Sequence, residues 1–159
     1  MPDFSQLFDH VNRISPDATT DEKSSPKAIL IPAQDLLKVC ADLHQSPDTY
    51  FDMLSCLTGI DNGVQANTMD VVYNLYSIPF NTHLMLRVLL PRENPVVDSV
   101  TSIWRTADWH EREAFDFLGI KFTGHPDLRR ILLPADWEGF PLRKDYHHQE
   151  YYRNIKVEY

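Results

Sequence analysis

The chain has 159 residues, of which 43% are hydrophobic and 24% are charged, and its net charge at pH 7 is −8. This size and composition are typical of one globular domain, and no apolar run approaches the roughly 18 residues that a membrane-spanning helix needs. Residues 1–110 carry 7 bases and 14 acids, and so acidic a body argues against nucleic acid as a partner. The first ten residues lack the basic and apolar regions of a signal peptide, so we expect a location in the cytosol or on the cytosolic side of a membrane.

The first third of the chain is expected to alternate helices with a link and a strand. Residues 12–27 are rich in Ser, Pro, Thr and Asp, which predicts a flexible link after a short N-terminal helix. The apolar run 28–31 predicts a buried strand, and apolar residues at helical spacing predict a helix over 33–44. A further helix is predicted through residues 51–57 and is expected to stop at Gly59.

Two strands and a long helix are expected next. Alternating apolar residues predict strands over 70–78 and 83–90, joined by a hairpin loop over 79–82. One apolar stripe at 100° per residue predicts a single helix over 95–118. Strands and helices interleaved with a hairpin favour an α+β two-layer domain, with a small mixed or antiparallel sheet and helices packed on one face.

The long predicted helix places a carboxylate among apolar side chains. Glu111 falls near the middle of the apolar stripe, whereas Glu113 lies on the opposite face. A buried carboxylate is costly unless it is paired or hydrogen-bonded. We therefore expect Glu111 to be buried and paired with one of the downstream arginines, which are Arg129, Arg130 and Arg143. The alternative is a helix that frays or kinks near Asp108 and leaves Glu111 exposed.

After this helix the chain loses its periodicity. Prolines and glycines between residues 124 and 146 prevent a long helix, and residues 130–133 are expected to form at most a short strand. From Pro134 the chain is predicted to run as an extended arm with aromatic anchors. The expected organisation is therefore a globular part, residues 1–123, and an extended arm and tail, residues 124–159, in the same single domain.

The tripeptide His125-Pro126-Asp127 has three possible interpretations. A catalytic His/Asp pair would need an activated nucleophile, and no Ser or Cys stands in a suitable context. The same tripeptide marks the J-domain of co-chaperones, but there it follows a basic helix, which is missing here. A structural turn, with Pro126 fixing the backbone, is the interpretation that the sequence favours.

The other candidates for metal or cofactor chemistry are weak. Cys40 and Cys56 stand alone, whereas an iron–sulfur cluster normally takes about four thiolates. The adjacent His147 and His148 point in different directions and have no evident third partner, which argues against a metal site. The chain also has no glycine-rich phosphate loop and no dinucleotide fingerprint.

The segment 111–146 is the most informative part of the sequence. It carries seven acids and six bases interleaved with aromatic, Gly and Pro residues, a pattern typical of a segment that is fixed against protein. It closely resembles the signature of the thirty-kilodalton subunit family of NADH–quinone oxidoreductase, which is respiratory complex I. The residues that carry the resemblance, which we take as candidate interface residues, are Glu111, Arg112, Glu113, Asp116, Gly119, His125, Pro126, Asp127, Leu128, Arg129, Arg130, Ile131, Leu132, Trp137, Gly139, Pro141, Leu142, Arg143, Lys144, Asp145 and Tyr146.

This resemblance implies a core subunit in the peripheral arm of a proton-translocating NADH:quinone oxidoreductase. Its partners would be the hydrogenase-like large subunit and the subunit that carries the terminal iron–sulfur cluster. FMN, the iron–sulfur clusters and quinone would lie in those and other partner subunits, so that this chain would hold no cofactor and no catalytic residue. It would scaffold the quinone-reduction module and reach the cytoplasmic side of the bacterial plasma membrane only through the complex.

Two alternatives are compatible with the same signature. The first is the equivalent subunit of a related membrane-bound hydrogenase, or of a dehydrogenase complex that takes electrons from another donor. The second and more remote alternative is a free-standing co-chaperone or adaptor that uses the His125-Pro126-Asp127 tripeptide.

Overall fold

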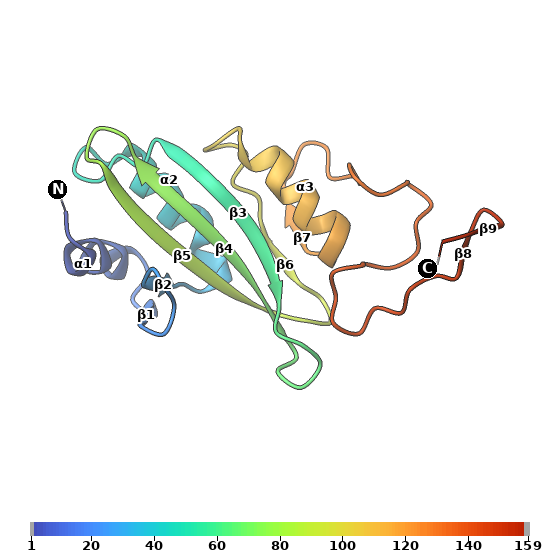
Figure 1. Cartoon of the computed structure of the whole chain (residues 1–159). Helices are drawn as coiled ribbons and strands as arrows, with labels where there is room; N and C mark the ends of the chain where they lie inside the picture. Colours follow the sequence, from blue (N-terminus) through green and yellow to red (C-terminus); the bar gives the residue numbers. More distant parts are fainter. Residues whose placement is uncertain (1, 158–159) are drawn as a thin grey trace.

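A five-stranded mixed sheet forms the centre of the molecule in the computed structural model, which describes residues 2–157. The strand order is β1-β2-β5-β4-β3 (Figure 1). The strands are β1 (Thr19–Asp21), β2 (Ala28–Leu30), β3 (Met53–Asp61), β4 (Thr68–Ser77) and β5 (Thr82–Pro91). β4 is antiparallel to both β3 and β5, whereas β2 runs parallel to β5. The α+β class and the β4–β5 hairpin predicted from the sequence are confirmed.

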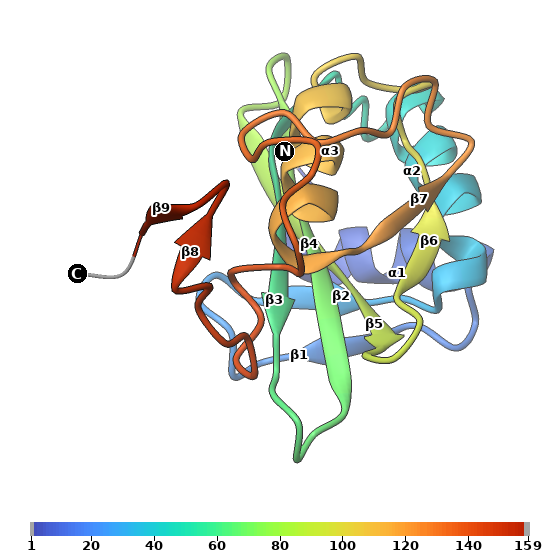
Figure 2. The same ribbon diagram turned by 90° about the vertical axis from the view of Figure 1, so that its right-hand side faces the viewer.

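Three α-helices accompany this sheet within residues 2–157. They are α1 (Phe4–Ile14), α2 (Leu36–Gln45), which follows a 3-10 turn, η1 (Ala33–Asp35), and α3 (Ala107–Leu118). Alternate strand residues such as Tyr73 and Leu86 are fully buried with Leu43 of α2 and Leu118 of α3 in one continuous core. Figures 1 and 2 show α2 and α3 lying along the sheet and α1 beside α2. None of the helices in the described part is long and apolar enough to cross a bilayer.

The helix predicted through residues 51–57 is wrong, because this segment forms the edge strand β3. Leu54 and Leu57 are three residues apart, a spacing that suggests a helix, yet both are buried on the same face of the sheet. The register with β4 shifts between Leu54 and Cys56, which marks a β-bulge. Residues on one face of a regular strand are two apart, but the extra residue, Ser55, brings Leu54 and Leu57 onto the same face. Their spacing of three therefore looks like that of a helix.

The single helix predicted over 95–118 is also wrong in its first half. Residues 96–98 form strand β6 (Val96–Asp98), which pairs in parallel with β7 (Lys121–Thr123), and α3 begins only at Ala107. Val97, Val100 and Trp104 of the first half are nevertheless buried, and the Trp104 indole N–H donates to the carbonyl of Phe51 at 3.0 Å. Turns bury these side chains here, so an apolar stripe alone does not prove a helix.

Two smaller expectations need correction. The link predicted over 12–27 is not loop throughout, because α1 extends to Ile14 and Thr19–Asp21 pairs with β2. Residues 130–133 are not a strand; the amides of 131–133 bind a side chain, as described below. The short hairpin of β8 (Tyr151–Tyr152) and β9 (Ile155–Lys156) lies near the end of the chain, at the opposite end of the molecule from α1 (Figure 1).

Candidate functional site: the arm and its anchors

The candidate site is built around the part of the chain that follows β7. We call residues 124–157 the arm. It leaves β7, passes along α3 and ends in the β8–β9 hairpin (Figures 1 and 2). The arm contains little regular structure, so its position depends on side-chain contacts with the globular part.

Asp116 of α3 is the first anchor of the arm. Its side chain is fully buried, and Oδ2 accepts three consecutive backbone N–H groups, from Ile131 at 3.1 Å, Leu132 at 2.8 Å and Leu133 at 2.9 Å. Its Oδ1 accepts from the Arg130 guanidinium at 2.9 Å. Burial by itself raises the pKa of Asp116, but these N–H groups and Arg130 outweigh it and hold the pKa below its usual value.

Arg130 links this anchor to a later part of the arm. The same guanidinium donates to the Asp116 carbonyl at 2.9 Å, and its other terminal nitrogen donates to the carbonyls of Trp137 and Gly139 at 3.2 and 2.8 Å. The guanidinium therefore closes the loop over 130–139 against the end of α3. An arginine with several planar donors suits this task better than a lysine.

A second anchor joins the arm to the ends of β3 and β5. Arg92 forms two hydrogen bonds with the buried carboxylate of Asp61, at 2.7 and 2.9 Å, and also pairs with Asp145 of the arm. The backbone N–H of Lys144 donates to Asp61 at 2.8 Å. The bonds from Arg92, with smaller contributions from the backbone of Lys144 and Gly63, overcome desolvation and hold the pKa of Asp61 well below its usual range.

Aromatic rings and glycines fill the space between the two anchors. Gly119 ends α3 with φ of 75°, a left-handed conformation that favours glycine, and a Cβ there would lie only 2.6 Å from the Phe140 ring. Phe140 in turn lies beneath the Arg143 guanidinium, at 4.9 Å from the ring centroid. Trp137 donates through its indole N–H to the Tyr146 hydroxyl at 3.1 Å. Phe140 therefore requires the glycine, because any side chain at residue 119 would displace the ring.

Glu111 is fully buried, as predicted, but its expected arginine partner is wrong. Its Oε1 accepts the backbone N–H of Val100 at 2.8 Å, and the nearest basic group is His125 Nε2, at 4.0 Å from Oε2. Arg130 binds Asp116, and Arg143 Nε donates to the Leu118 carbonyl at 2.7 Å. Burial raises the pKa of Glu111 to about 7, against the lowering effect of hydrogen bonds from Ser99 and Val100. We expected Glu111 to be an anion paired with an arginine, whereas its burial favours the protonated, neutral carboxyl.

His125-Pro126-Asp127 forms the structural turn that the sequence favoured. The backbone N–H of Asp127 donates to His125 Nδ1 at 3.0 Å, and the His125 ring itself is fully buried. Leu128 packs against the core, whereas Arg129 is exposed and pairs with Asp127. These contacts fix the point at which the arm leaves the domain.

The surface around these anchors exposes large apolar side chains. Trp109 is 64% exposed, and Leu132 and Leu142 are each 61% exposed. Arg112 lies over the Trp109 ring at 5.3 Å and donates to the Arg129 carbonyl at 3.2 Å. Exposed aromatic and aliphatic side chains beside arginines are typical of protein interfaces.

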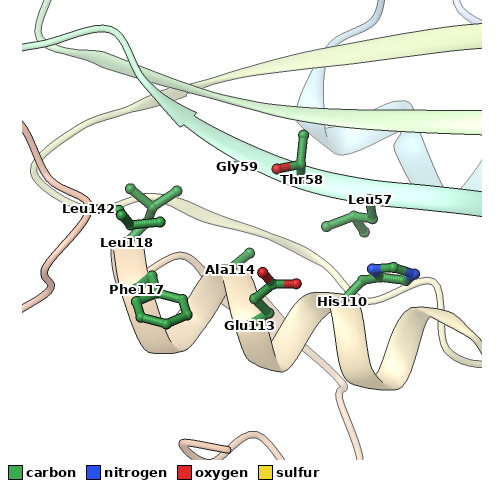
Figure 3. A pocket seen from close by; sticks show the side chains of 9 residues that line it. All are labelled: Leu57, Thr58, Gly59, His110, Glu113, Ala114, Phe117, Leu118 and Leu142. Carbon is green, nitrogen blue, oxygen red and sulfur yellow. The ribbon is translucent and has the colours of Figure 1, made fainter. Parts of the chain in front are cut away.

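A hollow of about 40 Å³ between β3 and α3 belongs to the same surface (Figure 3). Exposed Glu113 and half-buried His110 line it from α3, and Leu142 of the arm lies at the end of the helix, beside Leu118. The exposure of Glu113 on the face opposite Glu111 is as predicted. This hollow is small for a ligand and suits a single inserted side chain.

The remaining signature residues differ in their exposure. Pro126 is exposed, Pro141 is half-buried, and the Lys144 side chain is exposed while its backbone binds Asp61. Sequence reasoning missed Asp61 and also Arg92, which lies 53 residues before its partner Asp145. Arg92 directly follows the proline that ends β5, and no local pattern marks it as an anchor.

Fold and site together define an α+β protein with a candidate protein–protein interface. Residues 29–152 match the family described as the 30 Kd subunit of respiratory-chain NADH dehydrogenase. The C subunit of NADH-quinone oxidoreductase from Moorella thermoacetica is 40% identical over 140 residues, which cover 88% of this chain and 93% of the relative. The corresponding subunit from Chloroherpeton thalassium is 53% identical over 110 residues, which cover 69% of this chain and 45% of that longer relative.

Two solved structures share the fold. A trypsin-resistant fragment of Nqo5 superimposes with a TM-score of 0.64 at 24% identity, covering 78% of this chain and 98% of the fragment. A chain of the membrane-bound sulfane sulfur reductase, an archaeal respiratory membrane complex, gives a TM-score of 0.72 at 21% identity, covering 90% and 85%. The match over residues 29–152 and the Moorella relative show that the chain belongs to the respiratory-chain NADH dehydrogenase 30 Kd subunit family.

Proposed function

We propose that this chain is a subunit of a proton-translocating NADH–quinone oxidoreductase and that its role there is to hold neighbouring subunits in register. Its partners would be the hydrogenase-like large subunit and the subunit with the terminal iron–sulfur cluster. The complex would lie on the cytoplasmic side of the plasma membrane and carry electrons from NADH to quinone. The observation that carries the proposal is the arm, whose backbone is fixed by buried carboxylates while Trp109, Leu132 and Leu142 face outward around it.

A rigid backbone with exposed apolar side chains is well suited to a scaffold. The anchors at Asp116 and Asp61 hold the arm before any partner binds, so little conformational entropy is lost on association. The charged groups of the anchors are largely satisfied within the chain. Binding free energy would then come mainly from burial of the outward-facing apolar side chains.

The first prediction concerns Leu142, at the rim of the hollow between β3 and α3. Replacing Leu142 with Asp should reduce the amount of chain found in the assembled complex by about tenfold or more, because a charge would be buried at the interface. NADH–quinone reductase activity in membranes should fall in proportion, since no catalytic group is changed. Native gels and activity assays on membranes from cells that carry the variant would measure both.

The control for this variant is Leu89→Asp on the sheet, where Leu89 is 49% exposed and distant in sequence from the arm. Both variants should unfold at nearly the same temperature as the unchanged chain, and only Leu142→Asp should impair assembly. Equal losses of assembly would argue against an interface at the arm. Normal assembly of Leu142→Asp would exclude the hollow from the interface.

The second prediction concerns cofactors, which we propose this chain does not hold. Burial raises the pKa of Cys40 far above its usual range and so keeps it as a thiol, which is a poor metal ligand. Cys56 is half-buried, and no group of three or more metal-ligating side chains converges within residues 2–157. The purified full chain should therefore contain iron, zinc and flavin well below one equivalent. A stoichiometric cluster or flavin would contradict the scaffold role.

The alternative is the equivalent subunit of a related complex with another electron donor, which the fold shared with the sulfane sulfur reductase chain favours. Affinity capture of the tagged full chain from native membranes distinguishes the two. Flavoprotein subunits that oxidise NADH in the captured complex would support the first proposal. A captured membrane complex without NADH oxidation would support the alternative.

A further inference from the structure

A cluster of buried titratable groups at the start of the arm has no part in the proposed scaffold. The side chains of Glu111 and His125 are fully buried. His125 Nε2 lies 3.2 Å from the Asp108 carbonyl, 3.3 Å from Asp108 Oδ1 and 4.0 Å from Glu111 Oε2. Asp108 Oδ1 and Glu111 Oε2 are buried atoms, and neither receives a well-aligned hydrogen bond. Several acceptor oxygens thus face one ring nitrogen.

The backbone of the turn determines where the His125 proton lies. Because the Asp127 N–H donates to Nδ1, that nitrogen is the acceptor and Nε2 carries the proton. A second proton on the ring would sit on Nδ1 and point at the Asp127 N–H, so that two donors would face each other. His125 therefore cannot become a cation while the turn over 125–127 keeps its geometry. The single Nε2 proton has to be shared among the oxygens of Asp108 and Glu111.

Glu111 is surrounded by hydrogen-bond donors and a second acid, and Arg105, which lines the adjoining hollow beside Asp108, forms no ion pair with it. The backbone N–H of Val100, after β6, donates to Glu111 at 2.8 Å, the neighbouring Ser99 hydroxyl lowers the pKa of Glu111, and Asp108 on its own helix adds a second negative charge. From β4 comes the buried Tyr73 hydroxyl, which has no hydrogen-bond partner and lies near Cys40 and Asp98 as well. Within residues 2–157, no Lys or Arg side chain forms an ion pair with Glu111.

We infer that the protonation state of Glu111 controls whether the turn over 124–127 stays closed on α3, and we call Glu111, Asp108 and His125 together the clasp. With a proton on Glu111, the His125 Nε2–H remains with Asp108 and the turn over 124–127 stays on α3. When Glu111 loses its proton, a buried carboxylate without a counter-ion is left 4.0 Å from the His125 ring, and the turn opens toward the neighbouring hollow so that the charge can be hydrated. That hollow is lined by Thr101, Ser102, Arg105, Asp108, Gly124 and Pro126, so it adjoins both the turn and the Asp108 carboxylate.

The direction of the pH effect follows from the raised pKa of Glu111. Burial raises it from 4.5 to about 7, so the folded chain binds this proton more tightly than the unfolded chain does. The stabilisation is fully present below the unfolded value and is lost as pH rises through about 7. The closed turn therefore belongs to the acidic side of neutrality and the open turn to the alkaline side.

Amide hydrogen exchange on the full chain tests this clasp. Protection factors, which are corrected for the intrinsic effect of pH on exchange, should be measured about one pH unit below and above the Glu111 titration. In the unchanged chain, the protection of the His125 and Asp127 amides, whose hydrogen bonds belong to the turn, should fall by about tenfold across this interval, as the protonated fraction does. In Glu111→Gln, whose side chain cannot ionise, the protection should stay constant.

The matched control is Glu113→Gln, an exposed glutamate on the same helix, which should keep the pH dependence of the unchanged chain. A Glu111→Gln chain that still shows the tenfold fall would overturn the clasp, and so would an unchanged chain that shows none. If Glu111→Gln does not fold, nitrogen NMR of the His125 ring in the unchanged chain decides. Its Nε2 resonance should shift with the titration of Glu111, and a resonance that stays constant overturns the proposal. No partner is needed, so failure here leaves the proposed function unaffected.

Discussion

Replacing Asp116 with Ala should weaken the hold on the arm by about 3–5 kcal/mol, the usual effect of removing one partner of a buried ion pair. The change leaves the amides of residues 131–133 without their acceptor and Arg130 without its counter-ion. We expect the arm to detach before the globular part unfolds, because the core itself is not altered. Native-state hydrogen exchange of the Leu142 amide, which donates to the Phe117 carbonyl of α3 at 3.1 Å, would measure the loss in increasing urea.

An exposed carboxylate of the same arm, Asp136, provides the comparison through Asp136→Ala. Asp136 accepts hydrogen bonds from Tyr152 and Arg153, but these groups are exposed, so the free energy of unfolding should hardly change. Similar small effects of the two variants would show that the buried position of Asp116 contributes little. The arm would then be held by its aromatic contacts instead.

Replacing Arg92 with Ala is expected to have an effect of similar size at the second anchor, about 3 kcal/mol. The Asp61 side chain is 1% exposed, and without Arg92 its charge would keep only the N–H groups of Gly63 and Lys144. Asp145 would lose its partner as well. Urea unfolding of the full chain at neutral pH would measure the loss.

The pH dependence of the same variant offers a second test. Because Arg92 lowers the pKa of Asp61, this stabilisation is present above the unfolded value of 3.8 and is lost as pH falls through the lower folded value. In Arg92→Ala the acid-induced loss should be much smaller, since most of the stabilisation is already gone. Arg129→Ala, which removes an exposed pair with Asp127, should leave both the stability and its pH dependence nearly unchanged. A full acid-induced loss in Arg92→Ala would contradict the assignment.

Features that depend on local pattern could be predicted from the amino-acid sequence. Alternating residues marked β4 and β5, and helical spacing marked the helix over 33–44, because each element buries one face against the same core. The burial of Glu111 and the exposure of Glu113 also followed from the period of α3. The signature over 111–146 identified the family because its residues stand in a fixed order along the chain.

Contacts between groups that are distant along the chain became known only from the folded molecule. The bulge at Ser55 gave a strand a helical spacing, and the pairing of β6 with β7 replaced the first half of a predicted helix. Asp116 rather than Glu111 binds Arg130, because the chain returns to the end of α3 after Gly119 and not to its middle. Asp61 and Arg92 become anchors because the arm also passes the ends of β3 and β5, where Lys144 and Asp145 bind them. Charge pairing depends on distances in space, and no local period in the sequence encodes those distances.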